Sequence, residues 1–357
     1  MVSKKVLVIG PCLSMGGMER ASSNVANEMV KHGLKVVYLA IFKKDHFFQL
    51  DENVILDEPK EGINENKLSF FKTISRIRRR VLYHEPDSIL VFNKFYGAIS
   101  ALALIGNKVP FYVSERSSPL FVWKKSLKII NQIAFWLNSP NGVIAQTSIA
   151  AKYQKRYYRK SRIQVIPNIL RNSAIYPNLE RHNIILAVGR LGDYLKGFDL
   201  LLKSFALIKN KEWELHIAGG DENGQYLKDL ALKLGVLNRV KFLGKVKEID
   251  LVFAQAGLFV IPSRSEGFPN SLLEAMAAGV ASIAFDFVAG PKDIIENGEN
   301  GIIVPEGDIE SLAMTIDKLI LSPGERKRLG SNAKKIRDVY ESGKITRLII
   351  KFIFSNK

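Results

Sequence analysis

The feature that most constrains this chain is a regular alternation of short apolar, β-branched runs with longer stretches of helical spacing. The runs read KVLVIG, KVVYLAIF, SILVFN, PFYVSE, GVIAQT and IQVIPN, and then IILAVG, WELHIAG, VKFLG, LFVIPS, ASIAFD and GIIVP. Strands that are apolar throughout and alternate with helices are typical of parallel sheets covered on both faces. Two sets of about six such strands predict an α/β fold with two doubly wound, Rossmann-like domains.

The length of 357 residues also exceeds what one ordinary core accommodates. The segment 166–183 contains Pro167, Pro177 and several asparagines, which favours a domain boundary there. We therefore predict three parts: an N-terminal domain (1–170), a C-terminal domain (171–340) and a final helix (341–357).

The final segment carries apolar residues at helical spacing: Ile345, Leu348, Ile349 and Phe352. They indicate a helix that packs back on the N-terminal domain, with a tail that touches a membrane as the alternative.

Cysteine usage and the N-terminus indicate a cytoplasmic protein. Cys12 is the only cysteine, so no intrachain disulfide can form and a reducing compartment fits. The apolar run near the N-terminus is shorter than a signal sequence needs, and no window has the roughly 18 apolar residues of a membrane span.

The net charge of +17 is unevenly distributed. Residues 1–170 hold 26 Lys and Arg against 12 Asp and Glu, a net charge of +14, whereas residues 171–339 are neutral and the last 18 residues carry +3. A basic first half attracts phosphates, which belong to nucleic acids, anionic lipids or phosphorylated substrates.

The stretch EGFPNSLLE places two carboxylates, Glu266 and Glu274, around a predicted helix start. Ser271 and Glu274 fit a capping box, and Gly279 fits the helix end. A second interpretation is a ligand site, because a helix that begins at the carboxyl end of a parallel strand offers free N–H groups to an anion. Glu266 would then accept hydrogen bonds from sugar or ribose hydroxyls.

Two further strand-to-helix loops have phosphate-binding chemistry. Arg190 and Lys196 lie in VGRLGDYLKGF and can neutralise a diphosphate, although a solvated loop is equally compatible. Gly16 and Gly17 in GPCLSMGGMER let the backbone approach a phosphate closely, or form a flexible turn. Glu115 and Arg116 follow PFYVS as a surface ion pair or as residues that face an interdomain cleft.

No His spacing typical of a metal site and no D-x-D motif is found, so no metal is indicated. In the basic segment 68–86, the residues Phe70, Ile74, Ile77 and Val81 form one helical stripe. Core packing with a solvated face that carries Arg76, Arg79 and Arg80 is one interpretation, and docking on an anionic membrane is the other. The basic stretch 150–162 mixes cations with tyrosines in a similar way.

Taken together, these motifs resemble the retaining glycosyltransferases of family 4 (glycosyl transferases group 1), of the type that builds bacterial surface glycans. The resemblance covers nearly the whole chain. Its motifs stand in family order: GGMER, VIPN, VGRL…KGFDLLLKSF, VKFLGKV and EGFPNSLLEAMAAG. It implies the GT-B fold, with the two domains facing a cleft.

The resemblance also implies roles for residues of the second domain. Glu274 would bind the ribose of the nucleotide, and Glu266 would meet the hydroxyls of the donor sugar. Arg190 and Lys196 would hold the diphosphate and stabilise it as it leaves, so Glu266, Arg190 and Lys196 form the expected catalytic set. The remaining expected donor contacts of this domain are Lys245, Val246, Gly267, Phe268, Pro269, Asn270 and Ser271.

In the first domain, Gly16 and Gly17 would approach the donor, and Arg20, Glu115 and Arg116 would bind the acceptor. Two departures from the family pattern stand out. Lys196 follows Arg190 by six positions where the family usually has five, and Arg116 occupies a position where some relatives have His. Because Arg stays protonated, Arg116 is interpreted as a phosphate ligand rather than a proton carrier.

We therefore predict an enzyme that moves a hexose or N-acetylhexosamine from a UDP-sugar to a growing glycan. The resemblance implies same-face attack, in which a phosphate oxygen of the donor helps to deprotonate the acceptor. The acceptor is expected to be a glycan linked to polyprenyl diphosphate, in O-antigen, capsule or exopolysaccharide synthesis. The enzyme would need no metal and no obligate protein partner, and its basic domain would attach peripherally to the inner face of the membrane.

Three alternatives remain at this stage. One is a GT-B enzyme acting on a soluble acceptor, or a nucleotide-sugar epimerase. Another is a nucleic-acid-binding protein, which the absence of reader motifs disfavours. The third is a glycan-binding relative without activity, which the presence of Glu266, Arg190, Lys196 and Glu274 disfavours. The sugar, the linkage and the choice of UDP over GDP or ADP do not follow from the sequence.

Overall fold

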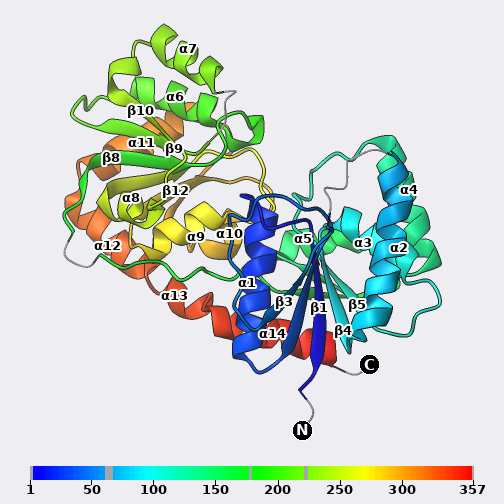
Figure 1. The fold of residues 1–357 in the computed structure, drawn as a ribbon. Coiled ribbons are helices and arrows are strands. Elements are labelled where there is room, and N and C mark those ends of the chain that lie inside the picture. The colour runs from blue at the N-terminus through cyan, green and yellow to red at the C-terminus, as the bar shows by residue number, and fades with distance from the viewer. Residues whose placement is uncertain (1–2, 61–66, 177–178, 221–223, 356–357) are drawn as a thin grey trace. The chain divides into compact units, whose positions relative to one another are not determined.

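The computed structural model describes residues 3–60, 67–176, 179–220 and 224–355. By their contacts they divide into two compact units. Unit 1 combines Met1–Ile169 with Tyr340–Lys357, and unit 2 is Leu170–Val339. Each unit contains one parallel sheet with helices between most successive strands (Figure 1). The predicted class, two doubly wound α/β sheets, is confirmed.

The sheet of unit 1 has seven strands in the order β3-β2-β1-β4-β5-β6-β7, and all neighbouring pairs are parallel. The strands are β1 (Lys5–Gly10), β2 (Lys35–Ala40), β3 (Val54–Asp57), β4 (Ser88–Phe92), β5 (Phe111–Ser114), β6 (Gly142–Ala145) and β7 (Arg162–Val165). The edge strand β3 is absent from the predicted set. It has only four residues and is partly exposed, so it lacks the apolar run by which the other strands are recognised.

The helices of unit 1 are α1 (Gly17–Lys31), α2 (Lys67–His84), α3 (Lys94–Ala103), α4 (Lys125–Leu137), α5 (Ser148–Gln154) and α14 (Ser342–Phe354). Alternate residues of β1 enter two different cores. Leu7 and Ile9 pack with residues of α2, α3 and α4, while Val6 and Val8 pack with residues of α1 and α14. Helices therefore cover both faces of the sheet, which explains why its strands are apolar throughout.

Helix α14 returns the chain to unit 1 from the end of unit 2. Its residues Ile345, Ile349 and Phe352 are buried, whereas Leu348 is about half exposed. Gly142 makes room for the Phe352 ring, since a Cβ at this position would lie 2.5 Å from the ring. The apolar stripe of the C-terminal tail is thus part of a protein core.

Helix α2 packs on the sheet in the way the core interpretation predicts. Ile77 and Val81 are fully buried, and Phe70 and Ile74 pack beside them. Asp57, at the end of β3, is contacted by three side chains of this helix: Arg76 (2.9 Å), Arg80 and His84 (2.7 Å). Two of the three arginines considered for membrane docking are therefore committed to a buried carboxylate.

The sheet of unit 2 has six parallel strands in the order β10-β9-β8-β11-β12-β13. They are β8 (His182–Val188), β9 (Glu214–Ala218), β10 (Val240–Gly244), β11 (Ala256–Ile261), β12 (Ala281–Phe285) and β13 (Ile302–Val304). All six coincide with predicted runs.

The helices of unit 2 are η1 (Tyr194–Lys196), α6 (Phe198–Leu207), α7 (Gln225–Lys233), η2 (Leu237–Arg239), α8 (Ile249–Gln255), α9 (Asn270–Ala277), α10 (Pro291–Ile294), α11 (Ile309–Ile320), α12 (Pro323–Ala333) and α13 (Ile336–Val339). Among the described parts of the chain, no helix combines the length and the apolar composition that crossing a bilayer requires.

Candidate functional site

The strand order of unit 2 reverses between β8 and β11. From β8 the chain continues to β9 and β10 on one side, and later adds β11, β12 and β13 on the other. The loops that follow β8 and β11 therefore leave neighbouring strand ends in opposite directions, and open α/β sheets bind ligands at such a reversal. The topology brings together the loop of Arg190 and Lys196 and the loop of Glu266.

Lys196 and Glu266 meet directly at this position. The Lys196 ammonium donates to both carboxylate oxygens of Glu266, at 2.8 and 3.0 Å, and the Ser263 hydroxyl donates to Oε1 at 2.8 Å. The side chains of Lys196 and Glu266 are 20% and 11% exposed, so both reach solvent only partly. Sequence reasoning named the two charges but did not predict that they pair.

The two loops are held against each other by backbone and side-chain contacts. Gly197 has a φ of +67°, and a Cβ at this position would lie 1.9 Å from the carbonyl oxygen of Pro262. Arg264 forms two hydrogen bonds of 2.7 Å with Asp199, and its guanidinium carbon lies 3.8 Å from the centroid of the Tyr194 ring. These contacts hold the loops in place and thereby position the Lys196–Glu266 pair.

Arg190, unlike Lys196, is exposed and does not contact Glu266 in the described structure. Its side chain is 75% exposed, and its guanidinium donates to Asp193 at 3.0 Å. The extra residue between Arg190 and Lys196 falls in a loop that ends in the short helix η1. The structure thus keeps Lys196 against Glu266 and leaves Arg190 at the surface of the same loop.

Of the two interpretations of Ser271 and Glu274, the capping box is wrong. Helix α9 begins at Asn270, its N-cap is Pro269, and no side chain caps it. Ser271 therefore lies inside the first turn, two residues after the cap position. The predicted helix end is confirmed, since Gly279 has a φ of +74° just after the C-cap Ala278.

Glu274 has a different role from capping. It is only 7% exposed, and its carboxylate lies 3.3 Å from Nε of Arg171. Arg171 also binds Asp250, at 3.0 Å through Nη1 and through a second contact from Nη2. Arg171 escaped sequence reasoning because it lies in the segment interpreted as a domain linker, which gives no signal of a buried ion pair.

The other expected donor contacts lie just before α9, in its first turn and after β10. Phe268 and Pro269 are buried, while Gly267, Asn270 and Ser271 are partly exposed. Lys245 and Val246 follow β10, two strands away from β8. The Lys245 side chain covers Gly220 at the end of β9, where a Cβ would lie 2.3 Å from it.

The sheet of unit 1 reverses in the same way, between β1 and β4. The loop after β1 leads to Gly16, which is the extended N-cap of α1, and to Gly17 and Arg20 in its first turn. The carboxylate of Glu19 folds over Gly16, where a Cβ would lie 2.1 Å from it, whereas the space beside Gly17 is open.

Glu115 is buried at the carboxyl end of β5 and does not form the surface ion pair considered above. Its Oε1 accepts the backbone N–H groups of Arg116 and Ser117, both at 3.0 Å. Burial raises the pKa of the Glu115 carboxyl. The loop backbone therefore orients this side chain.

Two cations lie close to the same strand ends. Burial lowers the pKa of Arg116 to about 9, and in the described structure Nε and Nη1 of Arg116 are buried without a hydrogen-bond partner. Lys94, the first residue of α3 after β4, is 5% exposed, and burial lowers its pKa to about 8 although Glu115 opposes the shift. Lys94 was missed, and its only sequence signal is its position directly after the strand SILVFN.

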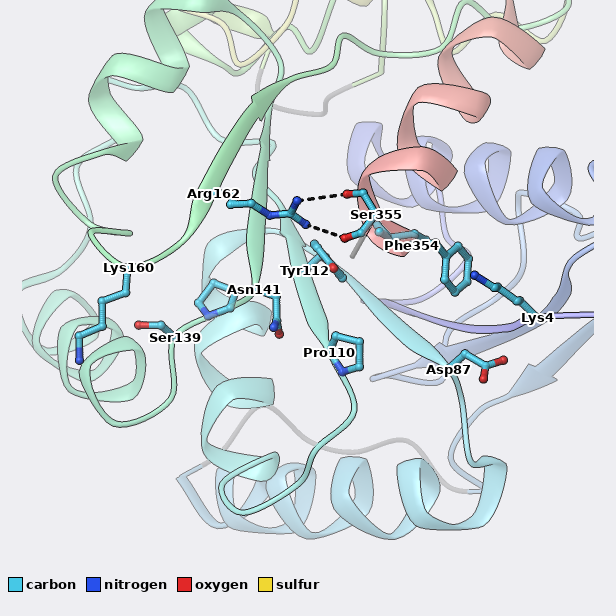
Figure 2. A pocket seen from close by; sticks show the side chains of 12 residues that line it. Lys4, Asp87, Pro110, Tyr112, Ser139, Asn141, Lys160, Arg162, Phe354 and Ser355 are labelled. Carbon is cyan, nitrogen blue, oxygen red and sulfur yellow. Dashed lines mark hydrogen bonds between the residues drawn. The ribbon is translucent and has the colours of Figure 1, made fainter. Parts of the chain in front are cut away.

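A separate hollow of about 610 Å³ lies at the opposite, amino edge of the sheet of unit 1. Figure 2 shows Lys4, Lys160 and Arg162 around it, together with Asp87 and the end of α14. The Arg162 guanidinium donates to the hydroxyl (3.1 Å) and the carbonyl (3.3 Å) of Ser355. Its charge thus stabilises the C-terminal end of a helix, which is a structural role.

Comparisons with known proteins agree with this architecture. Residues 15–170 match the family described as Glycosyltransferase Family 4, and residues 169–336 match Glycosyl transferases group 1. An uncharacterized glycosyltransferase of Haemophilus influenzae is 28% identical over 93% of this chain and 94% of its own.

A second relative, from Campylobacter jejuni, is 25% identical over 98% of both chains. Its name is GalNAc-alpha-(1->4)-GalNAc-alpha-(1->3)-diNAcBac-PP-undecaprenol alpha-1,4-N-acetyl-D-galactosaminyltransferase. Among solved structures, HepE of Anabaena in complex with UDP and glucose superposes with a TM-score of 0.82 at 18% identity, over 99% of this chain and 100% of that one.

Proposed function

Because the chain belongs to the family 4 (group 1) glycosyltransferases with the GT-B fold, we propose that it is a retaining, metal-independent enzyme that uses a UDP-sugar. It transfers a hexose or N-acetylhexosamine to a growing glycan carried on a polyprenyl diphosphate, in the synthesis of a surface polysaccharide. The observation that carries this proposal is the Lys196–Glu266 pair at the strand reversal of unit 2, beside the first turn of α9.

In the proposed donor complex, the diphosphate lies against the first turn of α9, whose N–H groups and dipole favour an anion. Lys196 supplies a charge there, and the exposed Arg190 side chain exchanges Asp193 for the phosphates. These cations stabilise the negative charge of UDP as the bond to the sugar breaks.

The two carboxylates bind hydroxyl groups on either side of the phosphates. Glu266 accepts hydrogen bonds from the sugar, and Glu274 accepts them from the ribose. Both carboxylates are already held by cations, Lys196 and Arg171, which orient them before the donor arrives.

The transfer step forms a bond between the acceptor oxygen and the anomeric carbon on the face from which UDP departs. The bond from that carbon to the β-phosphate oxygen breaks, and the acceptor proton passes to a phosphate oxygen of the leaving UDP. No side chain is required as a nucleophile.

For the acceptor, we propose that unit 1 binds a diphosphate through Arg116 and Lys94. Arg116 gains most from an anion, because phosphate oxygens would accept hydrogen bonds from its buried Nε and Nη1, which have no partner in the described structure. The Campylobacter relative, which acts on an undecaprenyl-diphosphate glycan by its name, supports this class of acceptor.

The donor assignment can be tested by thermal shift with UDP, UDP-sugars, GDP-sugars and pyrophosphate. We expect Glu274→Ala to lose stabilisation by UDP but keep that by pyrophosphate, and Lys196→Met to lose both. Glu212→Ala is the matched control, because this exposed carboxylate precedes β9 at the amino edge of the sheet. Equal stabilisation of wild type and Glu274→Ala by UDP would refute the assignment of Glu274 to the ribose.

Transfer assays test the remaining parts. The wild type should transfer sugar faster to a polyprenyl-diphosphate glycan than to the same glycan without its lipid diphosphate. Arg116→Met should remove most of this difference in transfer rate. Activity that disappears with EDTA and returns with a divalent cation would contradict metal independence.

A further inference from the structure

An apolar, positively charged face of unit 1 lies outside the regions that sequence reasoning considered for membrane contact. It comprises the loop 119–124 and the outer side of α4. Its exposed apolar side chains are between 47 and 88% exposed: Leu120, Phe121, Val122, Ile129, Ile133, Trp136 and Leu137. We name this set the α4 face.

The α4 face is the solvent side of a helix that has two apolar stripes. Asn131, Ala134 and Phe135 are buried toward the core that α4 shares with α2 and α3 (Figure 1). Ile129, Ile133 and Trp136 follow one another at i+4 and i+3 on the opposite side and point to solvent. A helix that only covers a sheet needs the first stripe alone, so the second indicates another apolar surface.

The loop in front of α4 is held in place rather than free. The Trp123 ring stacks on Phe95 with 6.5 Å between centroids, and the Phe121 ring meets Trp123 edge-on at 5.0 Å. Trp123 thus anchors the loop to α3, while its neighbours Leu120, Phe121 and Val122 remain exposed.

The charges around the α4 face are of one sign. Lys124, Lys125 and Lys128 are exposed on the loop and on the first turns of the helix. No Asp or Glu occurs between Glu115 and Glu180 in the sequence. An apolar helix stripe with lysines beside it and no acid is typical of a helix that lies in the headgroup region of an anionic bilayer.

We propose that the α4 face docks unit 1 on an anionic membrane surface. The choice of a bilayer as partner rests on the proposed lipid-linked acceptor. A symmetric dimer through this face would place Lys124, Lys125 and Lys128 of two copies opposite each other, with no acid in the segment to neutralise them. Charge complementarity therefore favours lipid over a second copy.

The proposal moves the docking surface away from α2. Arg76 and Arg80 of α2 bind Asp57, and the stripe from Phe70 to Val81 belongs to the core. Phe71 and Leu82 are nevertheless exposed on α2, so they provide a control within the same unit.

The test is flotation of the full chain with vesicles of phosphatidylcholine that contain one third phosphatidylglycerol. We expect wild type to float with these vesicles at low salt and to be released as the ionic strength rises, while vesicles of pure phosphatidylcholine retain it weakly. Ile133→Asp/Trp136→Asp should abolish flotation, and each of Lys124→Gln, Lys125→Gln and Lys128→Gln should weaken it about fivefold.

Two control variants carry the same kind of change at exposed apolar positions elsewhere. Phe71→Asp/Leu82→Asp on α2 and Met314→Asp/Leu321→Asp in unit 2 should float like wild type. In addition, Trp136 fluorescence should shift to the blue on the anionic vesicles and be quenched by brominated lipids. Buried Trp213 should respond to neither.

Three results would overturn the proposal. They are absence of wild-type flotation at low salt, equal flotation of the Ile133→Asp/Trp136→Asp variant, and a wild-type dimer in sedimentation that this variant converts to a monomer. Stabilisation by UDP, measured on the same variants, separates this proposal from the proposed function. A variant that no longer floats with vesicles but is still stabilised by UDP supports the α4 face as the docking surface. If UDP does not stabilise the wild type, only the proposed function is refuted.

Discussion

The pairing of Lys196 with Glu266 leads to an unusual prediction for Glu266→Gln. In the unliganded protein, the ammonium directs donors at both oxygens of the carboxylate. Lys196 has three N–H donors, so at most one remains for a phosphate while the pair is intact. A diphosphate must therefore share the lysine with Glu266 and approach a negative charge.

The size of the effect follows from this competition. A charge-assisted hydrogen bond contributes roughly 1.5–3 kcal/mol net. Glutamine keeps one acceptor for Lys196 but removes the negative charge, so only part of that energy is released. We expect UDP to bind Glu266→Gln more tightly by about 1 kcal/mol, which is roughly a fivefold lower Kd.

The assay is calorimetric titration with UDP, alongside a transfer assay with the UDP-sugar. Glu266→Gln should bind UDP more tightly and yet lose most transfer, because the carboxylate that holds the sugar is gone. Lys196→Met should bind UDP at least tenfold more weakly, and Glu212→Gln should match wild type. Weaker UDP binding by Glu266→Gln would refute the competition argument.

Three other predictions concern the folded state and its titration. Gly197→Ala should lower the free energy of unfolding by more than 2 kcal/mol, since it combines a left-handed φ, which costs about 1–2 kcal/mol, with a clash against Pro262. Gly235 also has a positive φ, but a Cβ there would have no neighbour within 4 Å, so Gly235→Ala should lose only the energy of the left-handed conformation. If urea denaturation gives the same loss of unfolding free energy for both variants, the clash at Gly197 is contradicted. Phe352→Ala should lower the free energy of unfolding by about 3–5 kcal/mol, because it leaves a cavity in the core where the ring centroids of Phe352 and Tyr112 lie 5.4 Å apart. A loss below about 1 kcal/mol would show that α14 is not anchored there. The pKa of Lys94 is lowered to about 8, so between pH 8 and its ordinary pKa of 10.5 the unfolded chain binds more protons than the folded one. The free energy of unfolding of wild type, relative to that of Lys94→Met, should therefore rise with pH across this window. If urea denaturation gives a difference that does not change with pH, the burial of the Lys94 charge is refuted.

The sequence by itself determined the fold class and the strands of unit 2. Runs such as LFVIPS and ASIAFD are apolar at every position, and this pattern occurs when helices cover both faces of a parallel sheet. It also located the candidate loops, because charged residues and glycines that directly follow such strands lie at the carboxyl edge of the sheet. The short edge strand β3 escaped prediction because it is partly exposed and lacks the pattern.

Only the tertiary structure decided how the candidate residues are partnered. Lys196 and Glu266 are 70 residues apart in the chain, and Arg171 and Glu274 are joined only through the fold. The capping box failed because local spacing places the helix start two residues too late, while the buried carboxylate finds a cation from a distant segment.

The α4 face illustrates the same limit. The sequence of α4 is apolar on two sides, and periodicity alone does not say which side the sheet covers. Burial of Phe135 and exposure of Trp136, adjacent in the chain, are set by which side of the helix meets the core. Long-range partners and exposed faces depend on packing between elements, which local spacing does not encode.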